Sequence, residues 1–147
     1  MDAMDAKIVQ LLQKDARMST SDIGERVGLS ASAISRRVAQ MERAGHILGY
    51  RAVVSPEARG VGFAAYVTVG LNAHTKAAQM AFERAILAAP QVRECHNISG
   101  NFEYMLRVEV ANLEGYKHFH TEVLGTLPSV VSIVTYVVMD SSKDERA

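Results

Sequence analysis

The chain has 147 residues, 48% of them hydrophobic, and a formal net charge of zero, which suits one compact globular domain or two small ones. No apolar run is long enough to cross a membrane, and the start, MDAMDAKIVQ, lacks the basic and apolar regions of a signal peptide. The single cysteine, Cys95, excludes an internal disulfide and a cysteine-based metal site. We therefore expect a cytoplasmic protein that has no membrane partner.

The zero net charge conceals an uneven distribution. Residues 1–60 contain nine Lys or Arg against seven Asp or Glu, whereas residues 61–147 contain seven against nine. Between residues 30 and 51 the only acid, Glu42, accompanies four arginines at positions 36, 37, 43 and 51. A local basic patch of this kind matters more for contact with phosphate than the total charge does.

Three short helices are predicted in the first part of the chain. Each begins at a residue whose side-chain oxygen can cap a helix, namely Asp2, Ser19 and Ser30. The second helix should end at Val27, because Gly28 can adopt the left-handed conformation of a chain reversal, and the third should end at Gly45. Gly24, with no side chain, would let the second and third helices cross closely.

The third helix has two different sides. Ile34, Val38 and Met41 form an apolar stripe at helical spacing, which must face the core. The opposite side has small residues near its start and arginines one turn later, so that the backbone can approach a surface and the arginines can bind phosphate or guanine. These are the demands of a helix-turn-helix that binds double-stranded DNA. Ser32, Ala33, Arg36 and Gln40 are predicted to lie near base edges, and Ser30, Arg37 and Arg43 near phosphates. The alternative is the solvated polar face of an ordinary three-helix domain.

In the second part of the chain the apolar residues change from helical spacing to the alternation of strands. Alternating apolar residues in 61–71 and 104–110 predict half-buried strands, the second with Tyr104, Leu106 and Val108 on one face. The run VVSIVTYVVM is nearly all apolar and predicts a strand covered on both sides. With a further strand after Pro90 and helices over Lys76–Ala88 and Leu113–Leu124, the order is the βαββαβ of a ferredoxin-like fold. The predicted class is α+β, with a helix-turn-helix domain at 1–50, a linker strand and hinge at 51–62, and a ferredoxin-like domain at 63–147.

The run DAKIVQLLQKDARMSTSDIGERVGLSASAISRRVAQMERAGHILGYRAVVSPEARG resembles the N-terminal, winged-helix-like domain of the Lrp/AsnC, or feast/famine, regulators. Signature positions within it include Asp5, Asp15, Gly28, Ser30, Arg36, Arg37, Gly45 and Tyr50. The second half resembles the family's effector and oligomerisation domain through PQVRECHNISGNFEYMLRVEV and VVSIVTYVVM.

The resemblance implies a transcription regulator that dimerises through the C-terminal sheets and a linker strand at about residues 48–54. Dimers of this family often assemble into tetramers or octamers, and many bind a small amino acid between neighbouring dimers. The implied effector-binding residues are Ser99, Gly100, Asn101, Phe102, Glu103, Tyr104 and Thr135.

Two residues of the effector loop depart from the family's common form. Asn101 replaces an aspartate, and Glu103 stands where aspartate or asparagine is usual. An amide can face the ammonium or the carboxylate of an amino acid, and the longer Glu103 would reshape a small pocket. The identity and the existence of the effector therefore stay open, and the loop can also be read as a plain strand connection. An effector-independent architectural DNA-binding protein is one alternative; a ferredoxin-like enzyme or small-molecule binding module is another.

No metal, cofactor or catalytic site is expected. His118 and His120 are two residues apart on a predicted helix, and Cys95 and His96 fall on opposite sides of a strand, so neither pair converges. Cys95 is better explained as a small buried hydrophobic residue. No set of nucleophile, base and orienting partner occurs, and we expect no enzyme.

Overall fold

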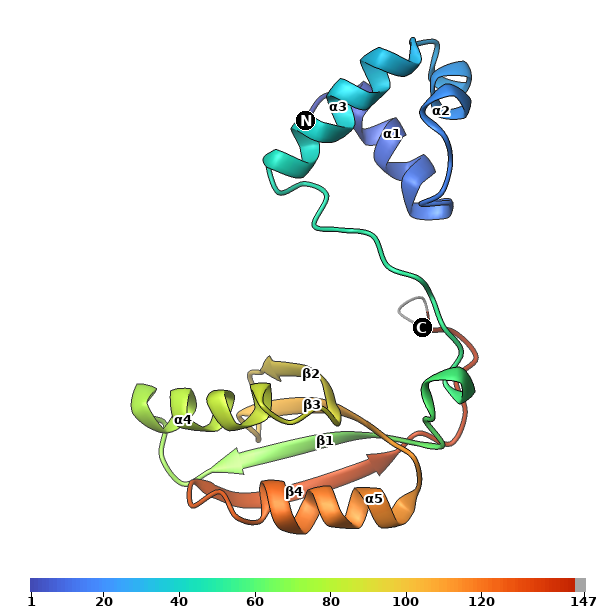
Figure 1. Cartoon of the computed structure of the whole chain (residues 1–147). Coiled ribbons are helices and arrows are strands. Elements are labelled where there is room, and N and C mark those ends of the chain that lie inside the picture. The colour runs from blue at the N-terminus through green and yellow to red at the C-terminus, as the bar shows by residue number, and fades with distance from the viewer. Residues whose placement is uncertain (145–147) are drawn as a thin grey trace. The chain divides into compact units, whose positions relative to one another are not determined.

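The computed structural model describes residues 1–144, which divide into two compact units, one through residue 52 and one from residue 53. The first unit contains helices α1 (Ala3–Lys14), α2 (Thr20–Val27) and α3 (Ala31–Arg43). The second contains η1 (Glu57–Arg59), β1 (Phe63–Leu71), α4 (Lys76–Leu87), β2 (Val92–Asn97), β3 (Tyr104–Val110), α5 (Leu113–His118), the π-helical η2 (Phe119–Leu124) and β4 (Val130–Val137) (Figure 1). No helix within residues 1–144 is long and apolar enough to cross a membrane.

The three predicted caps form in the helical unit. The side chains of Asp2, Ser19 and Ser30 each accept a hydrogen bond from the backbone N–H three residues later. At α1 the two hydrogen bonds form a reciprocal capping box, because the Asp5 carboxylate also accepts from the backbone N–H of Asp2 at 2.9 Å. These bonds satisfy N–H groups that a helix start leaves without a partner, so each helix begins where its cap lies.

The turn between α2 and α3 packs tightly on Gly24. Gly28 has a φ of 75°, the left-handed conformation expected of it. A Cβ at Gly24 would lie 2.4 Å from the carbonyl oxygen of Leu29. The prediction that Gly24 permits a close helix crossing is therefore corrected: the missing side chain makes room for the backbone of the turn that leads into α3.

One apolar cluster holds the helical unit together. Its fully buried members are Ile8, Ile23, Ile34 and Met41, so all three helices contribute. Val38, Leu29 and Ile47 pack around them, as the predicted stripe on the third helix requires. The described residues of this unit contain no strand; in the single chain residues 51–62 contain η1 and no strand, and the linker strand stays a prediction.

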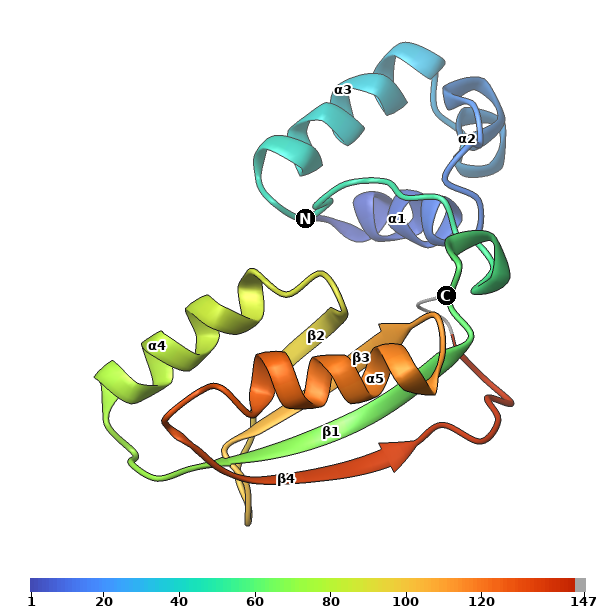
Figure 2. The same cartoon turned by 60° about the horizontal axis from the view of Figure 1, so that its bottom comes forward.

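The second unit is a four-stranded antiparallel sheet with one layer of helices on one face. The strand order is β2-β3-β1-β4, the order of a ferredoxin-like fold. Figure 2 shows α4 and α5 on the same side of this sheet, and residues of both helices join a single core cluster with β1 and β3. The opposite face of the sheet carries no helix among residues 53–144.

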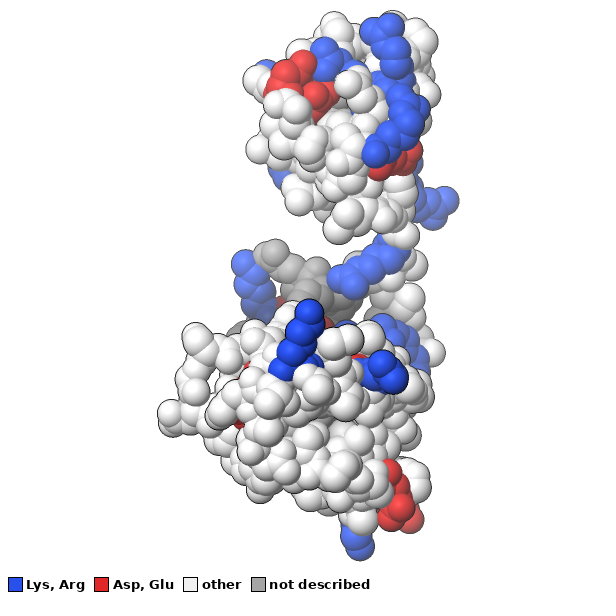
Figure 3. Space-filling model, turned by 90° about the vertical axis from the view of Figure 1, so that its left-hand side faces the viewer, with Lys and Arg blue, Asp and Glu red and all other residues white. Residues whose placement is uncertain are grey.

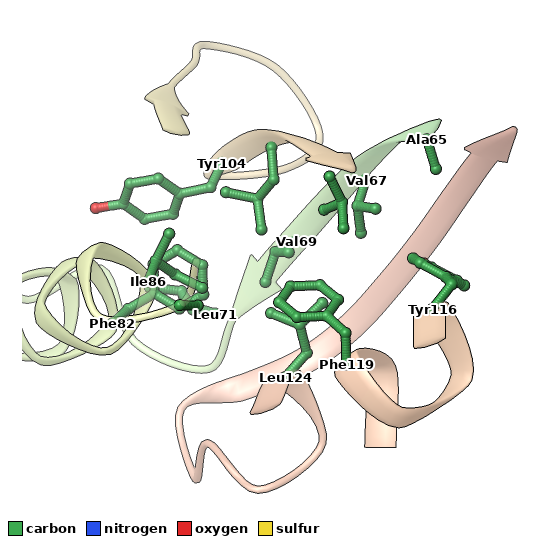
Figure 4. Close-up of a cluster of buried hydrophobic side chains, with 13 residues drawn as sticks. Ala65, Val67, Val69, Leu71, Phe82, Ile86, Tyr104, Tyr116, Phe119 and Leu124 are labelled. Atoms are coloured by element: carbon green, nitrogen blue, oxygen red, sulfur yellow. The ribbon is translucent and has the colours of Figure 1, made fainter. Parts of the chain in front are cut away.

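The core of the second unit lies between the sheet and the helices (Figure 4). Val67 and Val69 of β1 meet Phe82 and Ile86 of α4, all at most 2% exposed. The predicted core face of β3 is also correct, since Tyr104, Leu106 and Val108 are buried there.

The last helix changes its winding after His118. The predicted helix over 113–124 continues from α5 into a π-helical turn, which places Phe119 and Leu124, five residues apart, both at 0% exposure in the core. In a π-helix the backbone hydrogen bonds join residues five apart rather than four. Residues five apart therefore share a face.

The uncovered face of the sheet is part polar and part apolar. On β3 the buried carboxylate of Glu109 pairs with Arg59 at 2.6 Å and with Arg107 at 2.9 Å. On the edge strand β4 the prediction of a strand covered on both sides is wrong for the single chain, because Val134 is 37% and Tyr136 is 54% exposed. These side chains project from the face that carries no helix.

Candidate DNA-binding helix and effector loop

The outer side of α3 is open to solvent. Ser32, Arg36, Gln40 and Arg43 are exposed, and Ala33 is half-buried. Neither arginine of this set takes part in an ion pair within the described residues. Figure 3 shows a row of Lys and Arg side chains along one edge of the helical unit. The outer side of α3 can therefore offer two unneutralised guanidinium groups to an anionic surface.

The start of α3 is built from small hydroxyl residues. The Ser30 hydroxyl accepts from the backbone N–H of Ala33 at 3.2 Å and lies 3.1 Å from the Ser32 hydroxyl. Ser30 and Ser32 are exposed and their side chains are small, so the backbone of a ligand could approach this end of the helix closely. The N-terminal N–H groups of a helix also favour an anion.

Arg37 differs from the other arginines of α3. Its Nη1 donates to Asp2 Oδ2 at 2.8 Å and to Asp5 Oδ1 at 2.7 Å, and its side chain is 31% exposed. The hydrogen bonds to Asp2 and then Asp5 raise the pKa of Arg37. The predicted phosphate contact of Arg37 is thus at odds with its position, because the guanidinium is turned toward the start of α1.

A second contact ties the chain after α3 back to that helix. The Tyr50 hydroxyl donates to Glu42 Oε1 at 3.0 Å. The sequence alone does not reveal this bond, since Glu42 reads as one of several exposed charges.

The predicted effector loop connects β2 to β3. Gly100 has a φ of 137°, and Ser99, Gly100 and Asn101 are exposed. The loop closes on its own backbone, because the Ile98 N–H donates to the Glu103 carbonyl at 2.9 Å and the Glu103 N–H donates to the Val69 carbonyl at 3.1 Å. The end of β1 therefore fixes the position of the loop.

The Glu103 carboxylate already has two partners in the chain. Its Oε2 accepts from the backbone N–H of Leu71 at 2.7 Å, and its Oε1 lies 3.2 Å from Nδ1 of His74. The side chain is only 16% exposed. Gly70 leaves space beside it, since a Cβ there would lie 2.5 Å from Ser132 Oγ and 3.6 Å from Glu103 Oε2. The sequence does not indicate this contact, because His74 and Glu103 are 29 residues apart and only the fold brings them together.

Two residues predicted to contact the effector have side chains that bond to helices of the same unit. Tyr104 is 1% exposed, and its hydroxyl donates to Glu83 of α4 at 2.7 Å. Burial, and then this bond, raises the pKa of Tyr104 to about 12. The Thr135 hydroxyl shares a short hydrogen bond with Tyr116 of α5, on the helix-covered face. These two side chains have partners within the fold, whereas Ser99, Gly100 and Asn101 are exposed, and contact of the whole set with an effector stays a prediction.

The thiol and the histidines show no convergence. Among residues 1–144 no group of three or more His, Cys, Asp and Glu side chains is placed to hold a metal ion. Cys95 packs beside the core cluster, and burial, followed by the nearby Glu83, raises the pKa of its thiol.

Comparison with known proteins extends over both units. Residues 1–42 match the AsnC-type helix-turn-helix domain, and residues 64–147 match the Lrp/AsnC ligand binding domain. The proline dehydrogenase transcriptional activator of Rhizobium radiobacter is 37% identical over 98% of this chain and 92% of its own length. The leucine-responsive regulatory protein of Escherichia coli is 35% identical over 99% of this chain and 89% of its own.

A solved structure agrees over the same span. The chain is similar to a transcriptional regulator of Neisseria meningitidis, determined in complex with L-Met, with a TM-score of 0.91, 30% identity, and coverage of 98% of this chain and 93% of that one. The two matched domains follow one another along the chain, over residues 1–42 and 64–147. The protein belongs to the Lrp/AsnC family of transcriptional regulators.

Proposed function

We propose that this regulator binds double-stranded DNA by inserting α3 into the major groove. Ser32, Ala33, Arg36 and Gln40 approach base edges, and Ser30 and Arg43 contact phosphates. The observation that carries the proposal is the exposed outer side of α3, with two arginines free of ion pairs among the described residues. An arginine on such a helix can donate two hydrogen bonds to a guanine edge, and each good pair of this kind favours the right base by about 1–3 kcal/mol.

The test compares Arg36→Ala with the unaltered chain by fluorescence anisotropy. The target is a duplex selected from a random library by the unaltered protein, and a scrambled duplex serves as reference. Arg36→Ala should weaken binding to the selected duplex by about 1–3 kcal/mol and relax base preference at one position. Arg17→Ala, an exposed arginine outside α3, is the matched control. Equal weakening on both duplexes would reduce Arg36 to a backbone contact and refute its role in base recognition.

The protein acts as a homodimer or larger assembly formed through its sheets. Support comes from the apolar side chains of β4, such as Val134 and Tyr136, that the single chain leaves exposed. An exposed apolar strand at a sheet edge favours contact with another chain. Sedimentation should show at least a dimer, and Tyr136→Lys should lower its size. As a transcriptional regulator that binds DNA, the protein is proposed to act in the cytoplasm.

A small amino acid is the proposed effector, bound near Ser99, Gly100, Asn101, Phe102 and Glu103. The support is the match to the ligand-binding domain and the L-Met complex of the Neisseria relative. Bound between dimers, the amino acid would change their relative placement and hence the spacing of the α3 helices. Calorimetry with the twenty amino acids should give heat with at least one of them; no heat, with no change in assembly size, would refute the effector.

The second candidate is a regulator that needs no effector and organises DNA through its assembly. Glu103 favours it, because both carboxylate oxygens already have partners in Leu71 and His74. Footprints on unrelated DNA that lengthen with protein concentration, unchanged by amino acids, would support this candidate. Because the chain belongs to a regulator family, no catalytic activity is proposed.

A further inference from the structure

The capping box of α1 is shared with the DNA-binding helix. One oxygen of Asp2 accepts from the backbone N–H of Asp5 at 2.8 Å, and one oxygen of Asp5 accepts from the backbone N–H of Asp2 at 2.9 Å. The other two oxygens, Oδ2 of Asp2 and Oδ1 of Asp5, both accept from Nη1 of Arg37. All four carboxylate oxygens are therefore engaged, two in starting α1 and two in holding α3.

We infer that Arg37 is a positioning residue that fixes the orientation of α3 on α1, and that Asp2 and Asp5 are needed for site-specific DNA binding without touching DNA. The inference rests on the proposed function of α3. One nitrogen bridges two carboxylates that belong to a rigid capping box, so a small rotation of α3 would lengthen two charge-assisted hydrogen bonds at once. Arg36 and Gln40, on the outer side of the same helix, would move with it.

The charge balance also argues against a phosphate contact by Arg37. The three side chains together carry one net negative charge while the arginine is paired. If Arg37 turned to a DNA phosphate, it would leave two carboxylates unpaired near a polyanion. Like charges in proximity repel, so the paired arrangement should persist on DNA.

This leads to an expectation opposite to simple electrostatics. Removing an acidic charge from a DNA-binding unit normally strengthens binding, because the phosphates then meet less repulsion. Here Asp5→Asn should instead weaken binding to the selected duplex by about 3- to 10-fold, in the lower part of the range for residues that share one network. Arg37→Gln should have a similar effect, and the double variant should be no worse than either single one. Binding to scrambled DNA should not weaken.

The experiment measures these affinities with the full chain at 15 °C by anisotropy, over a series of salt concentrations. Glu25→Gln is the matched control, since it removes one exposed charge from the same unit and should leave the selected duplex bound as tightly as before, or slightly tighter. Arg37→Lys keeps the charge and a nitrogen that can donate to both carboxylates, so it should restore most of the affinity; it also serves if Arg37→Gln does not fold. For a positioning residue, the salt slope of Arg37→Gln equals that of the unaltered chain.

Three results would overturn the inference. A salt slope lower by about 0.9 in Arg37→Gln, with tighter binding by Asp5→Asn, would make Arg37 a phosphate contact. A lower melting temperature with unchanged affinity at 15 °C would give the cluster a purely structural role. Absence of any preferred duplex for the unaltered chain would refute the proposed function as well, whereas failure of the inference alone leaves the effect of Arg36→Ala intact.

Discussion

Gly24→Ala tests whether the backbone of the helix-turn-helix is as tightly packed as the structure indicates. The added Cβ would lie 2.4 Å from the carbonyl oxygen of Leu29, 3.5 Å from its carbonyl carbon and 3.6 Å from the carbonyl carbon of Ser30. The carbonyl of Gly24 accepts from the N–H groups of Gly28 and Leu29 at 2.8 and 3.0 Å, so the turn is bound closely to this residue. An ordinary contact would require the turn to move by about 1 Å, against these two bonds.

Two opposing effects determine how much Gly24→Ala lowers the free energy of unfolding. Alanine in a helix is favoured over glycine by about 1 kcal/mol, whereas overpacking a tight site costs about 1–3 kcal/mol. Because the obstructing atom belongs to the backbone and cannot rotate away, the cost should lie at the upper end, leaving a net loss of about 1–2 kcal/mol. In a unit this small each kcal/mol lowers the melting temperature by about 4–8 °C. We expect a fall on the order of 10 °C.

Thermal unfolding followed by circular dichroism and calorimetry on the full chain measures this loss. Gly115→Ala in α5 is the matched control, because its Cβ would meet Val110 Cβ at an ordinary 3.5 Å and helix propensity should then raise stability slightly. Gly24→Ala should also weaken DNA binding, since the displaced turn leads directly to Ser30 at the start of α3. A variant that melts at or above the temperature of the unaltered chain would refute the packing argument.

Four further outcomes follow from single contacts. Leu124→Ala should lower the free energy of unfolding by about 2–5 kcal/mol in urea, and a loss below about 1 kcal/mol would contradict the packing of the π-helical turn. Ser30→Ala removes the cap of α3 and should cost about 1 kcal/mol in thermal unfolding, whereas no change would mean that solvent replaces the cap. Because its thiol pKa is raised, Cys95 should react with a disulfide reagent at pH 8 far more slowly than free cysteine, and rapidly only in urea; equal rates in buffer would contradict its burial. Reciprocal backbone hydrogen bonds, and then Arg37, lower the pKa of both Asp2 and Asp5, so the folded chain binds fewer protons there than the unfolded chain. The resulting stability should be present above about pH 4 and lost as the pH falls through the lowered values, and Asp5→Asn should flatten this part of the melting curve against pH.

The helix starts could be predicted because capping is local. A cap needs one side-chain oxygen and an N–H three residues later, and both are visible in the sequence at Ser19 and Ser30. The same side chains can have second partners that local rules do not reveal. Asp2 and Asp5 meet Arg37 across 35 and 32 residues of chain, and only the packing of α3 against α1 brings them together.

Tyr104 and Thr135, two members of the predicted effector set, have side-chain partners within the fold, and the sequence indicates this for only one of them. Alternation in β3 places Tyr104 on the same face as Leu106, so its burial was already implied by the pattern and conflicted with a ligand role. For Thr135 the sequence held no such signal, because a nearly continuous apolar strand does not show which side faces the helices. Its bond to Tyr116 identifies that side.

The edge strand β4 shows that a sequence pattern can describe more than one chain. The run VVSIVTYVVM predicts burial on both faces, yet the single chain covers only the face that meets α5. Ile133 packs there, while Val134 and Tyr136 remain exposed on the opposite face. Exposed apolar residues on an edge strand promote association with other chains, so a soluble monomer would be expected to carry charged residues at these positions. Their apolar character is therefore explained if the open face of the sheet is buried in a homodimer, and the mismatch between sequence and single chain becomes an argument for the proposed assembly.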